Sequence, residues 1–570
     1  MQRVNYSKAG FYAAIMLILV MILPGLSLAQ GPAKNVIVLI PDGCSFEQYT
    51  LARWFKGAPL TTDSILTGAV KTYIADSVIA DSAPAATAYA TGTRTNDKYI
   101  GLSPDDKVLS TLTKPSPDML FRPMPTVLEA ARLMAKSTGL VATSRVSHAT
   151  PASFAAHVSH RKYEEDIMEQ MVYQGIDVVF GGGGQFLFAK ENQTSPYHQN
   201  LTGDPHSAEC QFSGNRADKE NLAAVLKSKG YKIVCNKDEM EALKEGRVFG
   251  LFANGHLAAE LDRPSFAPSE PTLEEMTVKA IELLSKNPNG FFLMVEGSQV
   301  DWACHANDPA HMIHDLLMFD KAVAVALEFA KKQGDTLVLA MPDHNTGGMS
   351  IGNYATSKSY PSTKVEELLE PLKKLKLTTP RLLAKAGKNP DPEKIKEVVK
   401  EFWSVDITDD EAKTILARSE QFKDDPNFGF GEVISPKYFK IGWTTHGHCG
   451  GDVPLAAYGP GKPGGLLDAP EIARVIAAAL GTDLAPLRDR LFMEAGQAFE
   501  GGTVTVDQTD KFNPVIKIDY KGRTAELPAN KNLIKIGSQI SELEGVVVYL
   551  AETGKAYLPR QAVEMVRNGQ

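Results

Sequence analysis

Five stretches of this 570-residue chain share one pattern, in which a short apolar run ends in a turn that carries polar side chains. Segments with helical character lie between these runs. Continuous apolar runs that alternate with helices predict an α/β fold, with a large, mostly parallel sheet covered by helices on both faces. Ligands of such sheets bind beyond the carboxyl ends of the strands. The five runs are residues 35–40, 139–143, 176–180, 290–295 and 335–340.

The predicted α/β domain covers residues 30–495 and carries two insertions, at about 186–250 and 361–425. The first insertion is polar, and the second is rich in Lys and Glu with helical periodicity. The second pattern is typical of solvated surface helices, and a cap over an active site is the other interpretation. From about 500 to 570, short alternating segments predict a small β-rich C-terminal module, whose role the sequence does not indicate.

Composition excludes several classes of protein. The chain has 60 Lys+Arg against 68 Asp+Glu, a net charge of -8, and 43% hydrophobic residues. These values are ordinary for a folded soluble protein and argue against a disordered or polytopic membrane chain. The negative charge also argues against a nucleic-acid partner held by bulk positive charge, so no nucleic-acid partner is implied.

Residues 1–29 have the features of a secretory signal peptide. A positively charged start precedes the apolar run 11–23, Pro24 breaks the run, and small residues lead to a cleavage site after Ala29. The run is shorter than the ~20 residues of a spanning helix, which favours cleavage over an uncleaved anchor. We therefore expect a secreted or periplasmic protein with no transmembrane segment after cleavage.

Export makes a disulfide possible, and Cys210 with Cys235 is the plausible pair among the five cysteines. Cys44, Cys304 and Cys449 lie near polar strand ends, and we interpret them as small buried apolar residues.

Carboxylates, imidazoles and a hydroxyl gather at the predicted strand ends. Asp301 and His305 are spaced i, i+4 and so share one helix face. Imidazoles with carboxylates suit zinc, whereas carboxylates with a hydroxyl and water suit magnesium. Each residue alone is a weak signal, since an Asp in a turn or a lone His usually has a structural role. The set is Asp42, His148, Thr150, Glu296, Asp301, His305, Asp343, His344 and His448.

Ser82 is the candidate nucleophile. It starts a segment of small, helix-forming residues in which Pro84 is tolerated in the first turn. The N-terminus of a helix favours an oxyanion or a phosphate through its free N–H groups. The alternative is an ordinary helix cap formed by Asp81 and Ser82.

Over about residues 30–490 the sequence resembles the alkaline phosphatases. The motifs that carry the resemblance are 41–43, 81–83, 148–151, 295–305, 343–344 and His448 before 456–460. The resemblance implies two zinc ions, one held by Asp301, His305 and His448, the other by Asp42, Asp343 and His344 facing Ser82. It also implies a third site, normally magnesium, at Asp42, Thr150 and Glu296.

The same resemblance implies hydrolysis of phosphate monoesters through a phosphoserine at Ser82. Arg161 would hold the phosphate and Asp81 would orient Arg161. Members of the family are often homodimers, which makes a homodimer an expectation here. Two positions depart from many bacterial relatives, because His148 replaces an Asp beside the third site and Trp302 replaces a Lys.

Three rival functions remain at this point. A sulfatase of the same superfamily needs an Arg four residues after the nucleophile, where this chain has Ala86. A phosphodiesterase of that superfamily carries Thr as nucleophile and lacks the arginine. The third rival is a metal-stabilised surface-binding protein that acts through its C-terminal module.

Overall fold

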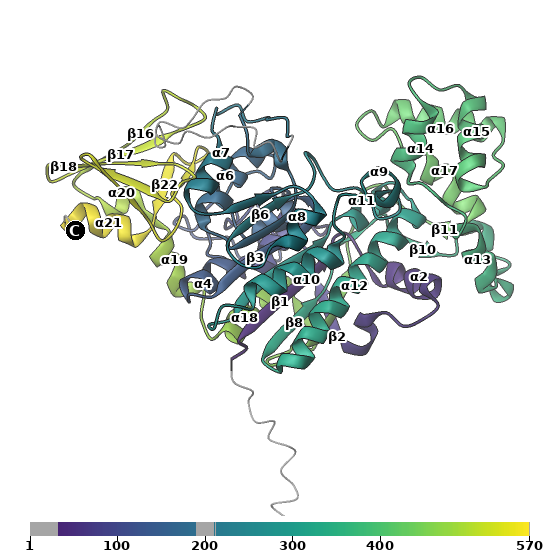
Figure 1. The fold of residues 1–570 in the computed structure, drawn as a ribbon, viewed down its shortest axis with the longest axis horizontal. Helices are drawn as coiled ribbons and strands as arrows, with labels where there is room; N and C mark the ends of the chain where they lie inside the picture. The colour runs from purple at the N-terminus through teal and green to yellow at the C-terminus, as the bar shows by residue number, and fades with distance from the viewer. Residues whose placement is uncertain (1–31, 190–209, 211, 569–570) are drawn as a thin grey trace, which may run out of the picture.

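A computed structural model describes residues 32–189, 210 and 212–568. Its centre is a ten-stranded sheet with the order β14-β2-β13-β8-β1-β7-β3-β4-β6-β5 (Figure 1). The strands are β1 (Asn35–Pro41), β2 (Leu66–Lys71), β3 (Ser137–Arg145), β4 (Val178–Gly182), β5 (Lys232–Val234), β6 (Val248–Leu251), β7 (Phe291–Gly297), β8 (Thr336–Ala340), β13 (Asp452–Tyr458) and β14 (Gly465–Asp468).

The sheet is mostly parallel, as the apolar runs predict. Within it β13 is the exception, because it runs antiparallel to both of its neighbours, β2 and β8. The amino end of β13 therefore lies at the same sheet edge as the carboxyl ends of the parallel strands. Residues that precede β13 can reach the same site as residues that follow β1, β7 and β8.

Helices cover both faces of the sheet because successive strand residues point to opposite sides. In β1, Val36 and Val38 enter one buried core, while Ile37 and Leu39 enter the other. The first core is closed by α3 (Ser82–Thr91), α4 (Val127–Leu133), α6 (Glu164–Gln174) and α18 (Ala469–Leu480). The second is closed by α2 (Phe46–Lys56), α10 (Leu273–Leu284) and α12 (Pro309–Gln333).

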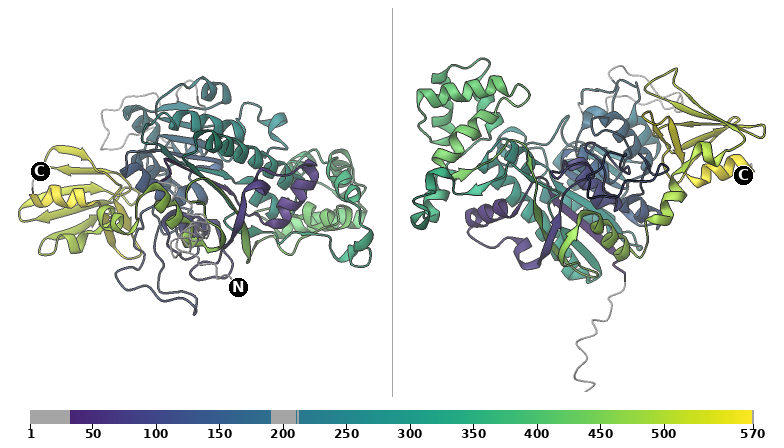
Figure 2. Two further views of the ribbon diagram at one scale, coloured as in Figure 1. Left: turned by 90° about the horizontal axis from the view of Figure 1, so that it is seen from below. Right: turned by 180° about the vertical axis from the view of Figure 1, so that it is seen from behind.

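The Lys- and Glu-rich segment forms helices, as its periodicity predicts. These helices make a lobe at one end of the molecule, opposite the C-terminal module (Figures 1 and 2). The lobe consists of α13 (Val365–Leu372), α14 (Thr379–Ala386), α15 (Pro392–Trp403), α16 (Asp409–Gln421) and α17 (Phe428–Tyr438).

The β-rich C-terminal module is confirmed. Its larger sheet is antiparallel, in the order β16-β17-β18-β19-β20, and a second sheet has the order β15-β22-β21. The elements are β15 (Met493–Glu494), α20 (Ala495–Ala498), β16 (Thr503–Asp507), β17 (Val515–Tyr520), β18 (Arg523–Pro528), β19 (Leu533–Ile536), β20 (Gln539–Glu542), β21 (Val548–Leu550), β22 (Lys555–Leu558) and α21 (Arg560–Asn568). Because β15 pairs with β22, the second sheet also uses residues before 500.

The segment 186–250 contributes more to the core than its polar composition indicates. Its strands β5 and β6 extend the central sheet. The predicted pair Cys210 and Cys235 is disulfide-bonded, with Cα atoms 5.6 Å apart. Of the remaining cysteines, Cys44 and Cys304 are buried as expected, whereas Cys449 is partly exposed.

The predicted signal peptide, residues 1–29, lies outside the described residues. Among the helices that are described, none is both long and apolar enough to cross a membrane.

The core packing predicts a large difference between two leucines of the same sheet. Leu293 lies in the central strand β7 and is 0% exposed, whereas Leu466 lies in the edge strand β14 and is 56% exposed. We expect Leu293→Ala to lower the free energy of unfolding by about 2–5 kcal/mol, through lost burial and a cavity. Leu466→Ala should change it by less than about 0.5 kcal/mol. Urea unfolding followed by circular dichroism measures both, and equal effects would contradict this placement of the core.

Candidate metal centre and active site

The strand ends of the central sheet bring the candidate residues together. Asp42 directly follows β1, and Glu296 lies at the end of β7. Asp343 and His344 follow β8 after a short turn. His448 lies four residues before β13, and reaches the same edge because that strand is antiparallel. Ser82 follows β2 and begins α3, with Asp81 as the N-cap residue.

One group of ligand atoms surrounds Ser82. Ligand atoms of Asp42, Asp343 and His344 lie within 4.8 Å of one another, and all three residues are buried. The Nε2 atom of His344 is 3.4 Å from a carboxylate oxygen of each aspartate. The hydroxyl of Ser82 lies 3.1 Å from this Nε2 and donates to Asp42 Oδ1 at 3.4 Å. These are the residues that the family resemblance implies for the zinc ion facing Ser82.

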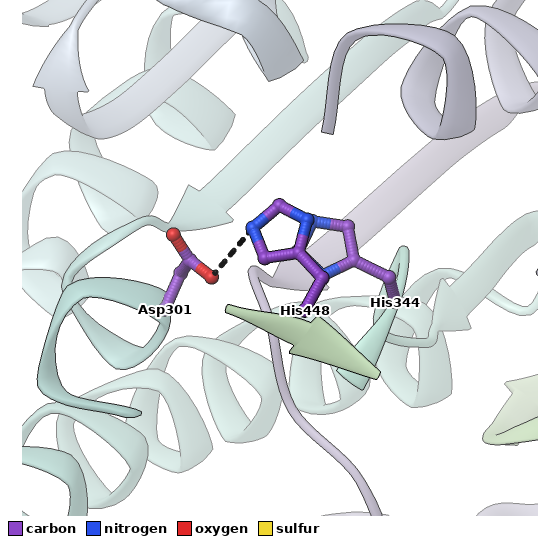
Figure 3. A group of neighbouring side chains, drawn as sticks. All are labelled: Asp301, His344 and His448. Atoms are coloured by element: carbon purple, nitrogen blue, oxygen red, sulfur yellow. Dashed lines mark ion pairs between the residues drawn. The ribbon is translucent and has the colours of Figure 1, made fainter. Parts of the chain in front are cut away.

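A second group adjoins the first. Ligand atoms of Asp301, His344 and His448 also lie within 4.8 Å of one another, and His448 Nε2 is 3.7 Å from Asp301 Oδ1 (Figure 3). His305 joins this group, with its Nε2 atom 3.1 Å from His448 Nε2 and 3.3 Å from Asp301 Oδ2. The predicted set of Asp301, His305 and His448 is therefore assembled, and His344 lies between the two groups.

The geometry also distinguishes His448 from the neighbouring His446. His448 donates from Nδ1 to the carbonyl of Ala80 at 2.7 Å, which turns Nε2 toward Asp301. His446 instead places Nε2 3.3 Å from Glu432 of α17, in the helical lobe. His448 is thus the histidine that faces the cluster. The lobe contacts the site through Glu432 and through Phe428, whose ring stacks on that of His305 with centroids 6.5 Å apart. The residues that line the pocket do not come from the lobe.

The predicted third site is built from unpaired polar atoms. Asp42 Oδ2, Thr150 Oγ1 and Glu296 Oε1 are buried and have no hydrogen-bond partner in the described part of the chain. The other carboxylate oxygen of Glu296 accepts a hydrogen bond from Ser144 at 3.1 Å. Buried polar groups are normally satisfied, so these oxygen atoms fit a hard cation such as magnesium.

The pKa values of several groups in this cluster are shifted away from their ordinary values. Burial, followed by repulsion from Asp343 and Asp301, raises the pKa of Asp42 well above its usual range. Burial likewise raises the pKa of Glu296 to about 7 and that of Asp343 to about 6. Burial lowers the pKa of His344 and of His448 to about 4. The charge of Asp301 outweighs burial at His305 and raises its pKa to about 9. The neutral imidazoles of His344 and His448 beside crowded carboxylates are donors that divalent cations need, so these residues fit metal ions.

A pocket of about 580 Å³ opens above Ser82. Arg161 lines it and donates from Nη1 to Asp81 Oδ1 at 2.7 Å. Burial lowers the pKa of Arg161, but the charge of Asp81 outweighs this and raises it overall. Asp81, Ser82 and Arg161 therefore meet at one wall of the pocket, as their predicted roles require.

His148 and Trp302, the two departures noted in the sequence, lie side by side. Their ring centroids are 5.6 Å apart, and His148 Nε2 is 3.0 Å from Arg161 Nη2. Burial, with the charge of Arg161, lowers the pKa of His148 well below its usual range. Because Arg161 can only donate, the neutral His148 accepts this hydrogen bond through Nε2.

Sequence reasoning missed three residues at this site. Lys98 lines the pocket and forms an ion pair with Asp81 Oδ2 at 3.3 Å. His256 packs on Trp302 with ring centroids 4.1 Å apart. Thr346 donates to Asp301 Oδ1 at 2.5 Å and lies 3.3 Å from His344 Nδ1. Thr346 was detectable, since it is two residues after His344, whereas Lys98 and His256 reach the site only through tertiary folding.

Gly43 explains why α11 (Gln299–His305), which carries Asp301 and His305, can lie so close to β1. Its φ of 65° is in the left-handed region. A Cβ atom there would collide with the Asp301 side chain and lie 2.7 Å from Thr346 Oγ1. Asp42 therefore supplies one candidate ligand, and Gly43 leaves the space that the side chain of Asp301 needs.

Known proteins resemble this chain over most of its length. A family model described as alkaline phosphatase matches residues 33–482. Alkaline phosphatase 4 of Bacillus subtilis (strain 168) is 35% identical over 475 residues, which cover 80% of this chain and 90% of that protein. The crystal structure of a cold-active alkaline phosphatase from Shewanella sp. is 27% identical, with a TM-score of 0.62, and covers 78% of this chain and 99% of its own.

A further solved structure of similar fold contains magnesium. It is a His-to-Asp variant of the alkaline phosphatase from the Antarctic bacterium TAB5, with magnesium bound in its M3 site. This structure is 25% identical to the chain, has a TM-score of 0.53, and covers 80% of this chain and 99% of its own.

The crowded carboxylates predict that cations stabilise the fold. We expect chelator-treated protein to melt at a lower temperature than the same protein with excess Zn²⁺, because binding at a hundred times Kd contributes about 2.7 kcal/mol. The variant Asp343→Asn should narrow this difference, since it removes one buried charge and one ligand. Thermal unfolding of the wild type and the variant by calorimetry tests both expectations. A melting temperature that does not change with Zn²⁺ would contradict a metal centre at this edge of the sheet.

Proposed function

Because this chain belongs to the alkaline phosphatase family and is thus a phosphoric monoester hydrolase, we propose that it works through a phosphoserine formed at Ser82. One observation carries the proposal: the Ser82 hydroxyl lies 3.1 Å from His344 Nε2 at the base of a pocket that Arg161 also lines. Nucleophile, ligand cluster and anion-binding arginine are thereby within reach of one small substrate.

We further propose which ions the ligand groups hold. Asp301, His305 and His448 would hold one zinc ion, and Asp42, Asp343 and His344 would hold a second. Asp42, Thr150 and Glu296 would hold magnesium, with His148 at its edge. The close ligand atoms support the zinc assignments, and the unpaired oxygens of Asp42, Thr150 and Glu296 support the magnesium assignment. When bound, these cations would neutralise developing charge on the phosphoryl oxygens and lower the pKa of an attacking hydroxyl or water.

The reaction proceeds in two balanced steps at Ser82. The Ser82 oxygen forms a bond to phosphorus while the bond from phosphorus to the ester oxygen breaks, and the alcohol leaves with a proton. Water then attacks the phosphoserine, which releases inorganic phosphate and restores the hydroxyl. Ser82 is the first residue of α3, so the free N–H groups of that helix end favour the negative charge that gathers on phosphate.

Arg161 binds the phosphate in this scheme. Its guanidinium can donate two parallel hydrogen bonds to phosphate oxygens, a geometry that a lysine does not match. Asp81 and His148 already hold its two terminal nitrogens, at 2.7 and 3.0 Å. The fork is therefore oriented before substrate arrives, which reduces the entropy lost on binding.

The remaining expectations concern the setting of the enzyme. We propose that the chain is exported, with residues 1–29 removed, and that it acts as a secreted or periplasmic enzyme on small phosphate monoesters. A homodimer and the absence of a nucleic-acid partner stay predictions. The positive, apolar start of the sequence supports export.

The nucleophile is tested by Ser82→Ala. We expect hydrolysis of p-nitrophenyl phosphate to fall by on the order of a thousandfold or more, because Ser82 is the serine whose hydroxyl contacts Asp42 and His344. Zinc content should stay near two ions per chain, since Ser82 is the lesser part of the ligand set. Ser77→Ala, which alters another serine of the same pocket, is the matched control and should retain activity.

Two comparison substrates separate the rival functions in the same assay. The wild-type enzyme should turn over the monoester faster than bis-p-nitrophenyl phosphate or p-nitrophenyl sulfate, and chelation should stop turnover. Equal activity of Ser82→Ala and the wild type would refute the nucleophile. Preference for the diester or the sulfate would assign the site to a phosphodiesterase or a sulfatase instead.

His148 is expected to govern the third site. We expect His148→Asp to increase the dependence of activity and melting temperature on Mg²⁺, because a carboxylate next to Thr150 and Glu296 adds a hard ligand. The magnesium-bound His-to-Asp variant of the TAB5 enzyme supports this expectation. Magnesium titrations of both proteins measure it, and superimposable curves would place His148 outside the third site.

A further inference from the structure

The C-terminal module, residues 493–568, lies beyond the part of the chain that the family model matches, which ends at residue 482. It packs beside α6 (Figure 1). Leu533 and Val548 of the module belong to the same buried core as Ile167 and Met171 of α6. The module is therefore joined to the catalytic domain through a shared core.

A buried ion cluster fixes this junction. Lys531 of the module is buried, and its Nζ atom pairs with Glu169 of α6 and, at 3.2 Å, with Glu220. Both glutamates are also buried. A lysine between two buried carboxylates is stable only while the module stays docked, because separation would leave uncompensated charges.

The residue beside Lys531 reaches the irregular segment between α5 (Ala149–Ser153) and α6. We call residues 154–163 the Arg161 segment. Asn530 Oδ1 accepts a hydrogen bond at 3.0 Å from Gln170 Nε2 of α6. The same Gln170 amide holds the backbone of His157, accepting from its N–H at 2.8 Å and donating to its carbonyl at 3.1 Å. Asn530 thus holds the side chain of Gln170, which in turn holds the backbone of the Arg161 segment at His157.

A second contact lies even closer to Arg161. The hydroxyl of Ser159 donates to the carboxylate of Glu552, in the turn before β22 of the module. The catalytic domain holds the segment from the other side, where Arg161 N donates to the carbonyl of Lys98 at 2.8 Å. The segment that carries Arg161 is therefore held between the catalytic domain and the module.

From these contacts we propose that the C-terminal module is a positioning element for phosphate binding: through Asn530 and Glu552 it holds the Arg161 segment in place. The proposal rests on the role of Arg161 given above. It assigns the module a part in the known reaction, in contrast to the surface-binding role considered from the sequence.

The test uses the full-length enzyme with Asn530→Gly and Glu552→Ala combined. Glycine suits position 530, where φ is 64°, so the first change removes only the side chain. Lys531 is left intact because its loss would endanger folding. We expect amide hydrogen exchange in residues 154–163 to quicken by roughly tenfold, since the local opening free energy falls. The KM for p-nitrophenyl phosphate and the Ki of inorganic phosphate should rise more than kcat falls.

Glu526→Ala is the matched control, because it removes an ion pair to Lys535 on the exposed sheet of the same module. It should leave exchange in the Arg161 segment and the Ki of phosphate unchanged. Unchanged exchange in the segment of the double variant would overturn the proposal, and so would faster exchange with an unaltered Ki. Arg161→Met serves as the reference. If this variant also leaves the Ki of phosphate unaltered, the result contradicts the phosphate-binding role assigned to Arg161.

Discussion

The structure depends on one electrostatic constraint, namely that several carboxylates are buried together at one edge of the sheet. Asp42, Glu296, Asp301 and Asp343 are all buried there, and Arg161 and the neighbouring imidazoles offset part of their charge. Burial, together with repulsion between the carboxylates, raises the pKa of Asp42, Glu296 and Asp343, so their ionised forms are costly without cations. Such an arrangement lowers the stability of the fold unless bound metal ions neutralise the carboxylates. This requirement for cations is the physical basis of the proposed hydrolase.

The fold meets this constraint through the direction of its strands. Parallel strands deliver Asp42, Glu296 and Asp343 to one edge, and the single antiparallel strand β13 delivers His448 to the same edge from its amino end. Helix α3 begins at Ser82 and so places this serine among them, in the wall of the pocket. Gly43 then allows Asp301 to approach. Strands and helices around the central sheet thus place most of the candidate ligands, while the peripheral lobe contacts His305 through the stacked ring of Phe428.

Much of this site was predictable from sequence, because strand ends are local features. The apolar runs located Asp42, Glu296, Asp343 and His344 directly, and the i, i+4 spacing located Asp301 and His305. Arg161 was identified only through family resemblance, since it does not follow a predicted strand. Lys98, His256 and the Asn530–Gln170 contact could not be predicted, because they arise where segments far apart in sequence dock. The polar segment 186–250 was interpreted as an insertion because β5 and β6 are too short for their apolar pattern to stand out.

The central claim is that paired divalent cations occupy the strand-end cluster with the Ser82 oxygen beside them. Anomalous diffraction from crystals of the purified enzyme, recorded on both sides of the zinc absorption edge, measures this directly. We expect one zinc peak among Asp42, Asp343 and His344, next to Ser82 Oγ, and another among Asp301, His305 and His448. Crystals with no zinc peak at either group, or with Ser82 Oγ turned away from both, would contradict the claim.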